Sequence, residues 1–301
     1  MIEILAREFV YLRYYLAIQF EQIFVYWVLG ILVGSFISVF LKGHIHRLMA
    51  RMKHLRLGVL GVVPASLLGI ASPLCMFGTI PLVASFANED MREDWIAAFM
   101  MSSILLNPQL LVYTGMLGTD AVWVRLITCA VGGILAGVLV HLCFRDRRFF
   151  SFSKLSDTAN RDTDKNPLLR YVKNVWRNVR ATGPYFLLGI VLTALYQRYV
   201  PSEWTTALFG GNRRWGVFMA STLGVPMYVC GGGTIPLIAQ WMRQGMSMGA
   251  AASFMLTGPA TKLSNLSAVK IVLGGKHFAL YLLYAAAFAF AAGTVVDMLF
   301  A

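Results

Sequence analysis

The segments LGIASPLCMFGTIPLVA (68–84) and LGVPMYVCGGGTIPLIA (223–239) align without a gap when the sequence is shifted by 155 positions, about half of its 301 residues. Over residues 68–102, 13 of 35 positions are identical to their counterparts in this alignment. An apolar composition would give scattered matches of Leu and Ala, but it would not place Cys, Gly, Thr and Pro in one register. The sequence therefore predicts two related halves of similar structure.

Apolar residues make up 58% of the chain and charged residues make up 13%. Soluble domains usually contain about 25% charged residues, so most of this chain is expected to lie in lipid. Apolar segments long enough to cross about 30 Å of hydrocarbon occur at 21–41, 94–117, 121–144, 182–200, 248–269 and 277–300. Two further segments, 57–87 and 215–242, are interrupted by Pro and Gly. The predicted fold class is an all-α polytopic membrane protein with four hydrophobic segments in each half.

The repeat divides the chain into a first transmembrane repeat (1–150), a basic cytoplasmic linker with an amphipathic helix (151–180) and a second transmembrane repeat (181–301). The first repeat is also expected to begin with an amphipathic helix, at 1–20. Both helices are expected to lie on the membrane surface, because their apolar residues alternate with charged ones at a helical spacing.

Basic residues predict the orientation of the repeats. Of the 26 Lys and Arg residues, 15 lie in 42–56 and 145–180, and loops rich in Lys and Arg stay in the cytoplasm. A single crossing by 57–87 would put 145–180 outside, whereas a re-entrant hairpin keeps both basic segments inside. The charges therefore predict a broken or re-entrant hairpin in each repeat and inverted topology of the two repeats, although Arg213 and Arg214 then fall outside.

The two hairpins carry the candidate substrate site, since broken helices meet near the middle of the membrane in many secondary transporters. In each motif, Thr79 or Thr234 is a candidate N-cap, and Pro81 or Pro236 would sit in the first turn, which tolerates a missing N–H. Free N–H groups would then point into the break, where glycines allow close approach of an anion or electronegative atom. These glycines are Gly78, Gly231, Gly232 and Gly233. The alternative is that each break is only a kink for helix packing.

Cys75 and Cys230 occupy equivalent positions beside the two breaks. Two such thiolates can bind a soft, thiophilic centre such as a metalloid in the substrate. A buried cysteine also serves commonly as a small apolar residue. The residues alone leave both roles open.

Polar residues inside two predicted spans extend the candidate site. Lys262 and Asn107 lie well within apolar segments, and an ionisable side chain at that depth usually faces a cavity, although a lysine can also extend to the membrane surface. Pro108 and Pro259 predict that these two helices are broken as well. Thr257 and Asn265, which flank Lys262, complete the predicted substrate-binding residues.

Other functional classes have no support in the sequence. Much of the net charge of +12 lies in loops beside membrane spans, so nucleic acid is not an expected partner. We find no P-loop, no HExxH, no Ser/His/Asp arrangement and no cofactor motif. The expected partners are a small-molecule or metalloid substrate and membrane lipid, and we expect a transporter rather than an enzyme.

The motifs PLCMFGTIPL (73–82), PMYVCGGGTIPL (226–237) and TGPAT (257–261) resemble the ArsP-type permease family, which includes efflux permeases for trivalent organoarsenicals. The resemblance covers essentially the whole chain. It implies a permease of a bacterial cytoplasmic (inner) membrane that exports a thiophilic solute and gives arsenic resistance. By the same resemblance, Cys75 and Cys230 correspond to the family's motif cysteines. The family's first motif often reads Cys-Ser-Cys-Gly, whereas this chain has Phe77 in place of the second cysteine.

Two alternatives to a secondary permease remain open from the residues. One is a passive channel for a small solute or anion. The other is a membrane thiol redox protein in which Cys75 and Cys230 form a reversible disulfide. No carboxylate relay lies clearly inside the spans, so the sequence indicates no proton-coupling residue.

Overall fold

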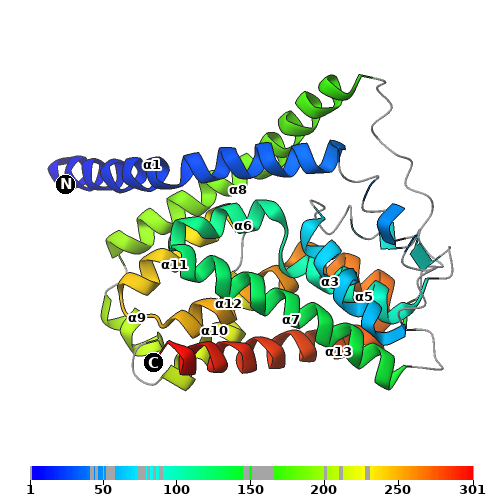
Figure 1. The fold of residues 1–301 in the computed structure, drawn as a ribbon. Coiled ribbons are helices and arrows are strands. Elements are labelled where there is room, and N and C mark those ends of the chain that lie inside the picture. The colour runs from blue at the N-terminus through cyan, green and yellow to red at the C-terminus, as the bar shows by residue number, and fades with distance from the viewer. Residues whose placement is uncertain are drawn as a thin grey trace.

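The computed structural model describes the whole chain except residues 1, 41–43, 45–46, 50, 52–57, 73–78, 80–81, 84–85, 88–90, 145–148, 151–165, 200–201, 210–212, 228–230 and 301. The described residues form helices joined by turns and loops (Figure 1), which confirms the all-α class. The helices are α1 (Ile2–Phe40), η1 (Gly58–Gly61), α3 (Val62–Ala71), α5 (Glu93–Leu105), α6 (Pro108–Thr114), η2 (Gly115–Leu117), α7 (Thr119–Cys143), α8 (Pro167–Tyr199), α9 (Ser202–Phe209), α10 (Arg213–Met227), α11 (Gly231–Arg243), α12 (Met248–Thr261) and α13 (Leu263–Leu299).

Within the described part of the chain, three helical segments are long and apolar enough to cross a membrane: Glu93–Leu117, Thr119–Cys143 and Val272–Leu299. They coincide with the predicted spans 94–117, 121–144 and 277–300. The predicted spans 21–41 and 182–200 are helical in nearly all of their described residues and lie almost entirely within α1 and α8.

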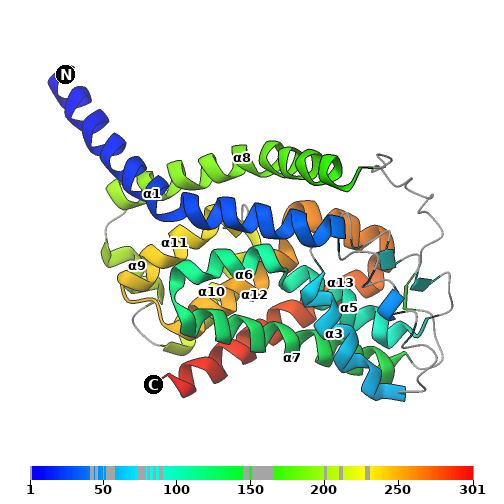
Figure 2. The same ribbon diagram turned by 45° about the horizontal axis from the view of Figure 1, so that its top comes forward.

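The expected amphipathic helices continue into the spans that follow them. α1 runs through 39 residues, which makes it about 58 Å long at 1.5 Å per residue. α8 runs through 33 residues and passes Pro184 without ending. α1 and α8 lie side by side (Figures 1 and 2), and Asn178 Nδ2 donates to Ser35 Oγ between them over 2.9 Å.

The helices that follow pack in the same order in both halves. α3 lies against α5 and α7, and α10 lies against α12 and α13 in the corresponding way. Small polar residues allow the close approach in the first half, since the hydroxyls of Ser66 and Ser102 are 2.7 Å apart and Ser66 donates to the carbonyl of Ala130 over 3.0 Å. Such hydroxyl contacts satisfy polar groups where lipid offers no partner.

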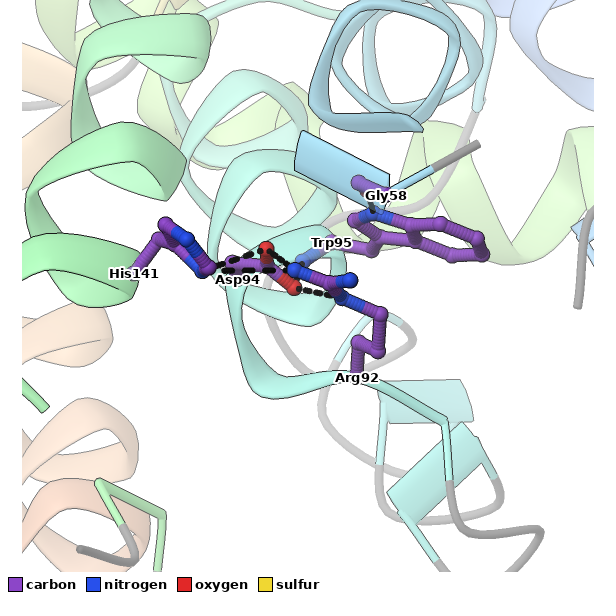
Figure 3. A network of polar contacts seen from close by, with 5 residues as sticks. All are labelled: Gly58, Arg92, Asp94, Trp95 and His141. Carbon is purple, nitrogen blue, oxygen red and sulfur yellow. Dashed lines mark hydrogen bonds and ion pairs between the residues drawn. The ribbon is translucent and has the colours of Figure 1, made fainter. Parts of the chain in front are cut away.

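A polar network fixes the start of α5 to the neighbouring helices (Figure 3). Asp94 accepts hydrogen bonds from Arg92 Nη2 over 2.6 Å and from the backbone N–H of Trp95 over 3.0 Å. The hydrogen bond to Asp94 also raises the pKa of Arg92 above its ordinary value. His141 Nδ1, from α7, lies 3.3 Å from Asp94 and 3.2 Å from Arg92, so it donates to the first or accepts from the second according to its tautomer. Trp95 Nε1 donates to the carbonyl of Gly58 over 2.9 Å.

Two of the predicted spans are broken in the middle. At Asn107 the backbone is extended (φ −136°, ψ 166°), which separates α5 from α6 and confirms the break predicted from Pro108. The span predicted at 248–269 is not one helix, because the backbone leaves the helical conformation at Lys262 (φ −53°, ψ 130°). Pro259 itself lies inside α12, which continues to Thr261, so the break falls after the position predicted from the proline.

The segments after the two breaks each contribute side chains to a hydrophobic core formed mainly by the opposite half, and α6 also packs against α1 of its own half. We call 108–117 and 263–273 the exchanged segments. Residues of the first, including Tyr113, belong to a hydrophobic core formed mainly by the second half, with Ile235 and Met255. Residues of the second, including Val269 and Val272, belong to a core formed mainly by the first half. The exchange joins the halves and brings both breaks to the contact between them.

Candidate functional site

The first motif reaches the site through Thr79. Thr79 is helical and fully buried, and its hydroxyl lies 2.9 Å from that of Ser103 in α5. Ser103 is four residues before Asn107, about one helical turn. Thr79 of the first motif is therefore held against the helix that ends at the first break.

The second motif begins a helix, but not at the predicted residue. α11 starts at Gly231, so Thr234 is a buried residue within its first turns and not the N-cap, and Pro236 lies inside the helix. The prediction was wrong because all three glycines adopt the helical conformation. The first N–H groups of a helix have no partner inside it, and in α11, which starts at Gly231, they include those of Gly231, Gly232 and Gly233. The donors expected at this break are therefore mainly those of the glycines.

Asn107 and Lys262 occupy equivalent positions, since they are 155 residues apart, and each stands between two helices. Asn107 Oδ1 accepts a hydrogen bond from the N–H of Leu110 over 2.8 Å and so caps α6. Lys262 is partly buried at the junction of α12 and α13. Thr257 is buried one turn earlier, where its hydroxyl donates to the carbonyl of Ser253 over 3.0 Å.

Four predicted site residues lie outside the described residues: Cys75, Gly78, Pro81 and Cys230. Asn265 lies in α13. The described residues contain no group of three or more His, Cys, Asp and Glu side chains able to hold a metal ion. The two described cysteines are free thiols, with Cys129 buried and Cys143 exposed.

The sequence prediction missed Arg125, which lies in α7 and is 1% exposed. Its Nη1 donates to Thr114 Oγ1 over 2.6 Å and lies 3.7 Å from the sulfur of Met255. Because Arg125 lies close to the start of a predicted span, the sequence alone suggests that its side chain lies at the membrane surface. Only the packing of α12 onto α7, which brings Met255 over it, shows that it is enclosed.

The polar groups of the candidate site are mainly donors and cations. They comprise the side chains of Arg125 and Lys262, the hydroxyls of Thr79 and Thr234, and the first N–H groups of α11. Such groups favour a neutral electronegative or anionic solute over a free cation.

Comparison with protein families matches residues 6–298 to ArsP_1, described as a predicted permease. The chain is 24% identical over 183 residues to the UPF0718 protein MJ0584 of Methanocaldococcus jannaschii, an alignment that covers 61% of this chain and 45% of that protein. It is 22% identical over 254 residues to the UPF0718 protein YraQ of Escherichia coli strain K12, covering 84% of this chain and 71% of that one.

A third relative is the UPF0718 protein YcgR of Bacillus subtilis strain 168, with 28% identity over 93 residues, or 31% of this chain and 32% of that protein. The chain thus spans less than half of the length of MJ0584 and of YcgR, and about seven-tenths of YraQ. No solved structure matches. Since the family match extends over nearly the whole chain and the helices suit a bilayer, this integral membrane protein belongs to the ArsP_1 family of predicted permeases.

Proposed function

We propose that this chain is a secondary permease of a bacterial cytoplasmic membrane that exports a small thiophilic solute, such as a trivalent arsenical or organoarsenical. The solute site lies between two repeats of inverted topology, at their broken helices. The observation that carries this proposal is the packing of the exchanged segments, 108–117 and 263–273, into the opposite halves.

The exchange supports a site between the halves because it puts both breaks where the halves meet. Backbone outside a regular helix is tolerated at membrane depth only where protein or a polar cavity covers it. Asn107 and Lys262 each interrupt a predicted span and are each partly buried by protein. A solute bound there would be reached from either side as one repeat moves against the other.

The inverted topology is supported by contacts at one end of the molecule. Gly58 lies at the start of the first predicted hairpin (57–87) and Trp95 follows that hairpin, and their hydrogen bond brings both to the same end, as a re-entrant hairpin requires. Phe149, six residues after the end of α7, lies there too, because its N–H donates to Glu93 Oε2 over 2.7 Å. The basic segments 42–56 and 145–148 adjoin these residues in sequence, so this end is the cytoplasmic one under the positive-inside rule.

The thiophilic character of the solute follows from the sequence positions of Cys75 and Cys230, each in a motif at one of the hairpin breaks. Cysteine sulfur prefers soft centres such as trivalent arsenic. Each cysteine lies close in sequence to a residue of the proposed site. Cys230 directly precedes Gly231, and Cys75 is four residues before Thr79.

Export is tested in inside-out membrane vesicles loaded from outside with trivalent methylarsenite or inorganic arsenite. Wild-type vesicles should accumulate the arsenical, and Cys75→Ser and Cys230→Ser should each abolish the accumulation. Cys143→Ser is the matched control, because Cys143 is exposed at the end of α7, and it should transport like wild type. Unchanged transport by both motif variants would refute thiol coordination, and no transport by wild type would refute arsenical export.

A further inference from the structure

α7 carries a buried arginine that none of the sequence motifs includes. Arg125 is six residues after Thr119, so it lies about 9 Å along the helix from its first residue. With a side chain that is 1% exposed, it is one of the largest fully buried side chains among the described residues. A charged group is expensive to bury in a membrane protein and usually marks a functional site.

The hydrogen bonds of Arg125 to Thr114 and Met255 use one of its three nitrogens, and the thiol of Cys129 also lies close to the guanidinium group. Nη1 donates to Thr114 Oγ1 over 2.6 Å and lies 3.7 Å from Met255 Sδ. Thr114 uses its own proton to donate to the carbonyl of Leu110 over 2.7 Å, which leaves a lone pair for the arginine. Arg125 therefore connects the first exchanged segment to α12, across the contact between the halves.

The other two nitrogens, Nε and Nη2, are buried and have no hydrogen-bond partner in the described part of the chain. They form one edge of the guanidinium group, the edge that binds carboxylates and oxyanions through two parallel hydrogen bonds. Thr114 and Met255 supply no negative charge to balance the cation. A buried charge without a counter-charge is strongly unfavourable, so the arrangement favours a bound anion.

We infer that Arg125 is the centre of an anion-binding site between the two halves, which binds a small oxyanion or carboxylate through Nε and Nη2. Binding of the anion is independent of arsenical export. Transport of the anion, as part of the solute or as the solute itself, rests on the proposed function.

Inorganic sulfate and acetate are suitable probes, with chloride at equal ionic strength as the reference. Sulfate should raise the unfolding temperature of the purified full chain in detergent in a saturable way.

Arg125→Lys keeps the charge but loses the two-donor edge, and should bind sulfate about tenfold more weakly than wild type. Arg125→Met should not bind sulfate. Arg180→Gln, which changes an exposed arginine of α8, should bind like wild type. Absence of sulfate and acetate binding in wild type, or full binding by Arg125→Met, overturns the inference.

Stability without added sulfate gives a second readout. Met has nearly the length of Arg, and Thr114 keeps its hydrogen bond to Leu110 when the guanidinium is removed. Arg125→Met should therefore unfold at a higher temperature than wild type in chloride buffer without sulfate, and at a lower one than wild type in saturating sulfate. A lower unfolding temperature of Arg125→Met in both buffers would show that the protein already neutralises the charge, and would overturn the inference.

Cys129 is the one described residue whose ionisation could supply that charge from the same helix face, since it is buried one turn after Arg125. Cys129→Ala should bind sulfate like wild type. Binding that appears only in Cys129→Ala would identify a thiolate as the partner of Arg125 and overturn the inference.

Proteoliposomes loaded with radiolabelled sulfate show whether the bound anion is transported cargo or a resident counter-ion. Efflux that Arg125→Met abolishes identifies the anion as cargo, whereas binding without efflux identifies a resident counter-ion; both results support the site. Arsenical export is measured in parallel. Its absence from wild type would contradict the proposed function and leave the binding result intact.

Discussion

The carboxylate of Asp297, near the end of α13, accepts a hydrogen bond from the backbone N–H of Gly249 at the start of α12 over 2.7 Å. Its other oxygen accepts from Ser247 Oγ over 2.9 Å, and Ser247 in turn caps α12 by accepting from the N–H of Ala250. A negative charge from the last helix thus stabilises the positive end of α12. In the first half, α5 is the helix that corresponds to α12. There the negative charge at the start of the helix comes from Asp94, which lies in the first turn of α5 itself.

Replacing Asp297 by Ala should lower the stability of the folded chain by about 2 kcal/mol, because a buried N–H and a partly buried hydroxyl lose a charged acceptor. Thermal unfolding in detergent measures the change. Asp120→Ala is the matched control, since Asp120 is an exposed acidic residue in the first turn of α7. It should cost no more than about 0.5 kcal/mol. Equal losses in the two variants would contradict the capping role of Asp297.

Gly133 marks the closest approach of α7 to its neighbours, and an added Cβ there would overlap with Ser102 Oγ and approach Ser66 Oγ. Gly133→Ala should therefore destabilise the chain by about 1–3 kcal/mol. Gly183→Ala makes the same change inside α8, where an added Cβ meets no atom within 4 Å. It should be neutral or stabilising by up to about 1 kcal/mol, through helix propensity. The opposite signs are visible in paired unfolding curves, and a loss of stability in both variants would argue against the overlap.

Asn107 has a structural role as the cap of α6, and a proposed role in the solute site. Asn107→Ala should lower stability by about 1 kcal/mol through loss of the cap. Asn107→Asp keeps an acceptor for the N–H of Leu110 but adds a negative charge at the break. It should keep wild-type stability and lose transport of an anionic solute. If Asn107→Asp transports sulfate at the wild-type rate, Asn107 caps the helix without facing the solute.

Lys262 is expected to contribute positive charge at the second break. Lys262→Met should reduce transport of an anionic solute in proteoliposomes by about tenfold, the effect of losing one charge-assisted hydrogen bond. Lys270→Met is the control, because Lys270 is exposed two turns later on α13. Equal transport rates in the two variants would separate Lys262 from the solute pathway.

The features that the sequence predicted best are those carried by local signals. Apolar length predicted the spans around α7 and the second part of α13, and Pro108 at the first position of α6 predicted the break at Asn107. Pro259 gave a less accurate prediction, because α12 accommodates the proline and ends only at Lys262. Proline limits where a helix can continue, but the surrounding packing decides where it stops.

The features that the sequence missed depend on contacts between distant residues. Arg125 stands near the start of an apolar span, and nothing within α7 indicates that Met255, 130 positions later, covers it. The sequence does not reveal the packing of the exchanged segments either, since their apolar side chains would be equally stable against lipid or against protein. The N-cap predicted at Thr234 failed for a local reason, because glycine weakens a helix and yet Gly231 to Gly233 start α11.

The exchanged segments have a consequence for biosynthesis. Tyr113 leaves the ribosome more than 120 residues before Ile235, with which it shares a core. Until that later helix is inserted, the first half can form its own contacts between α3, α5 and α7, but its exchanged segment has only α1 and α7 to pack against and lacks its contacts with α11. Synthesis of the second half therefore completes the folding of the first, and a chain truncated between the halves exposes an apolar helix to other membrane proteins.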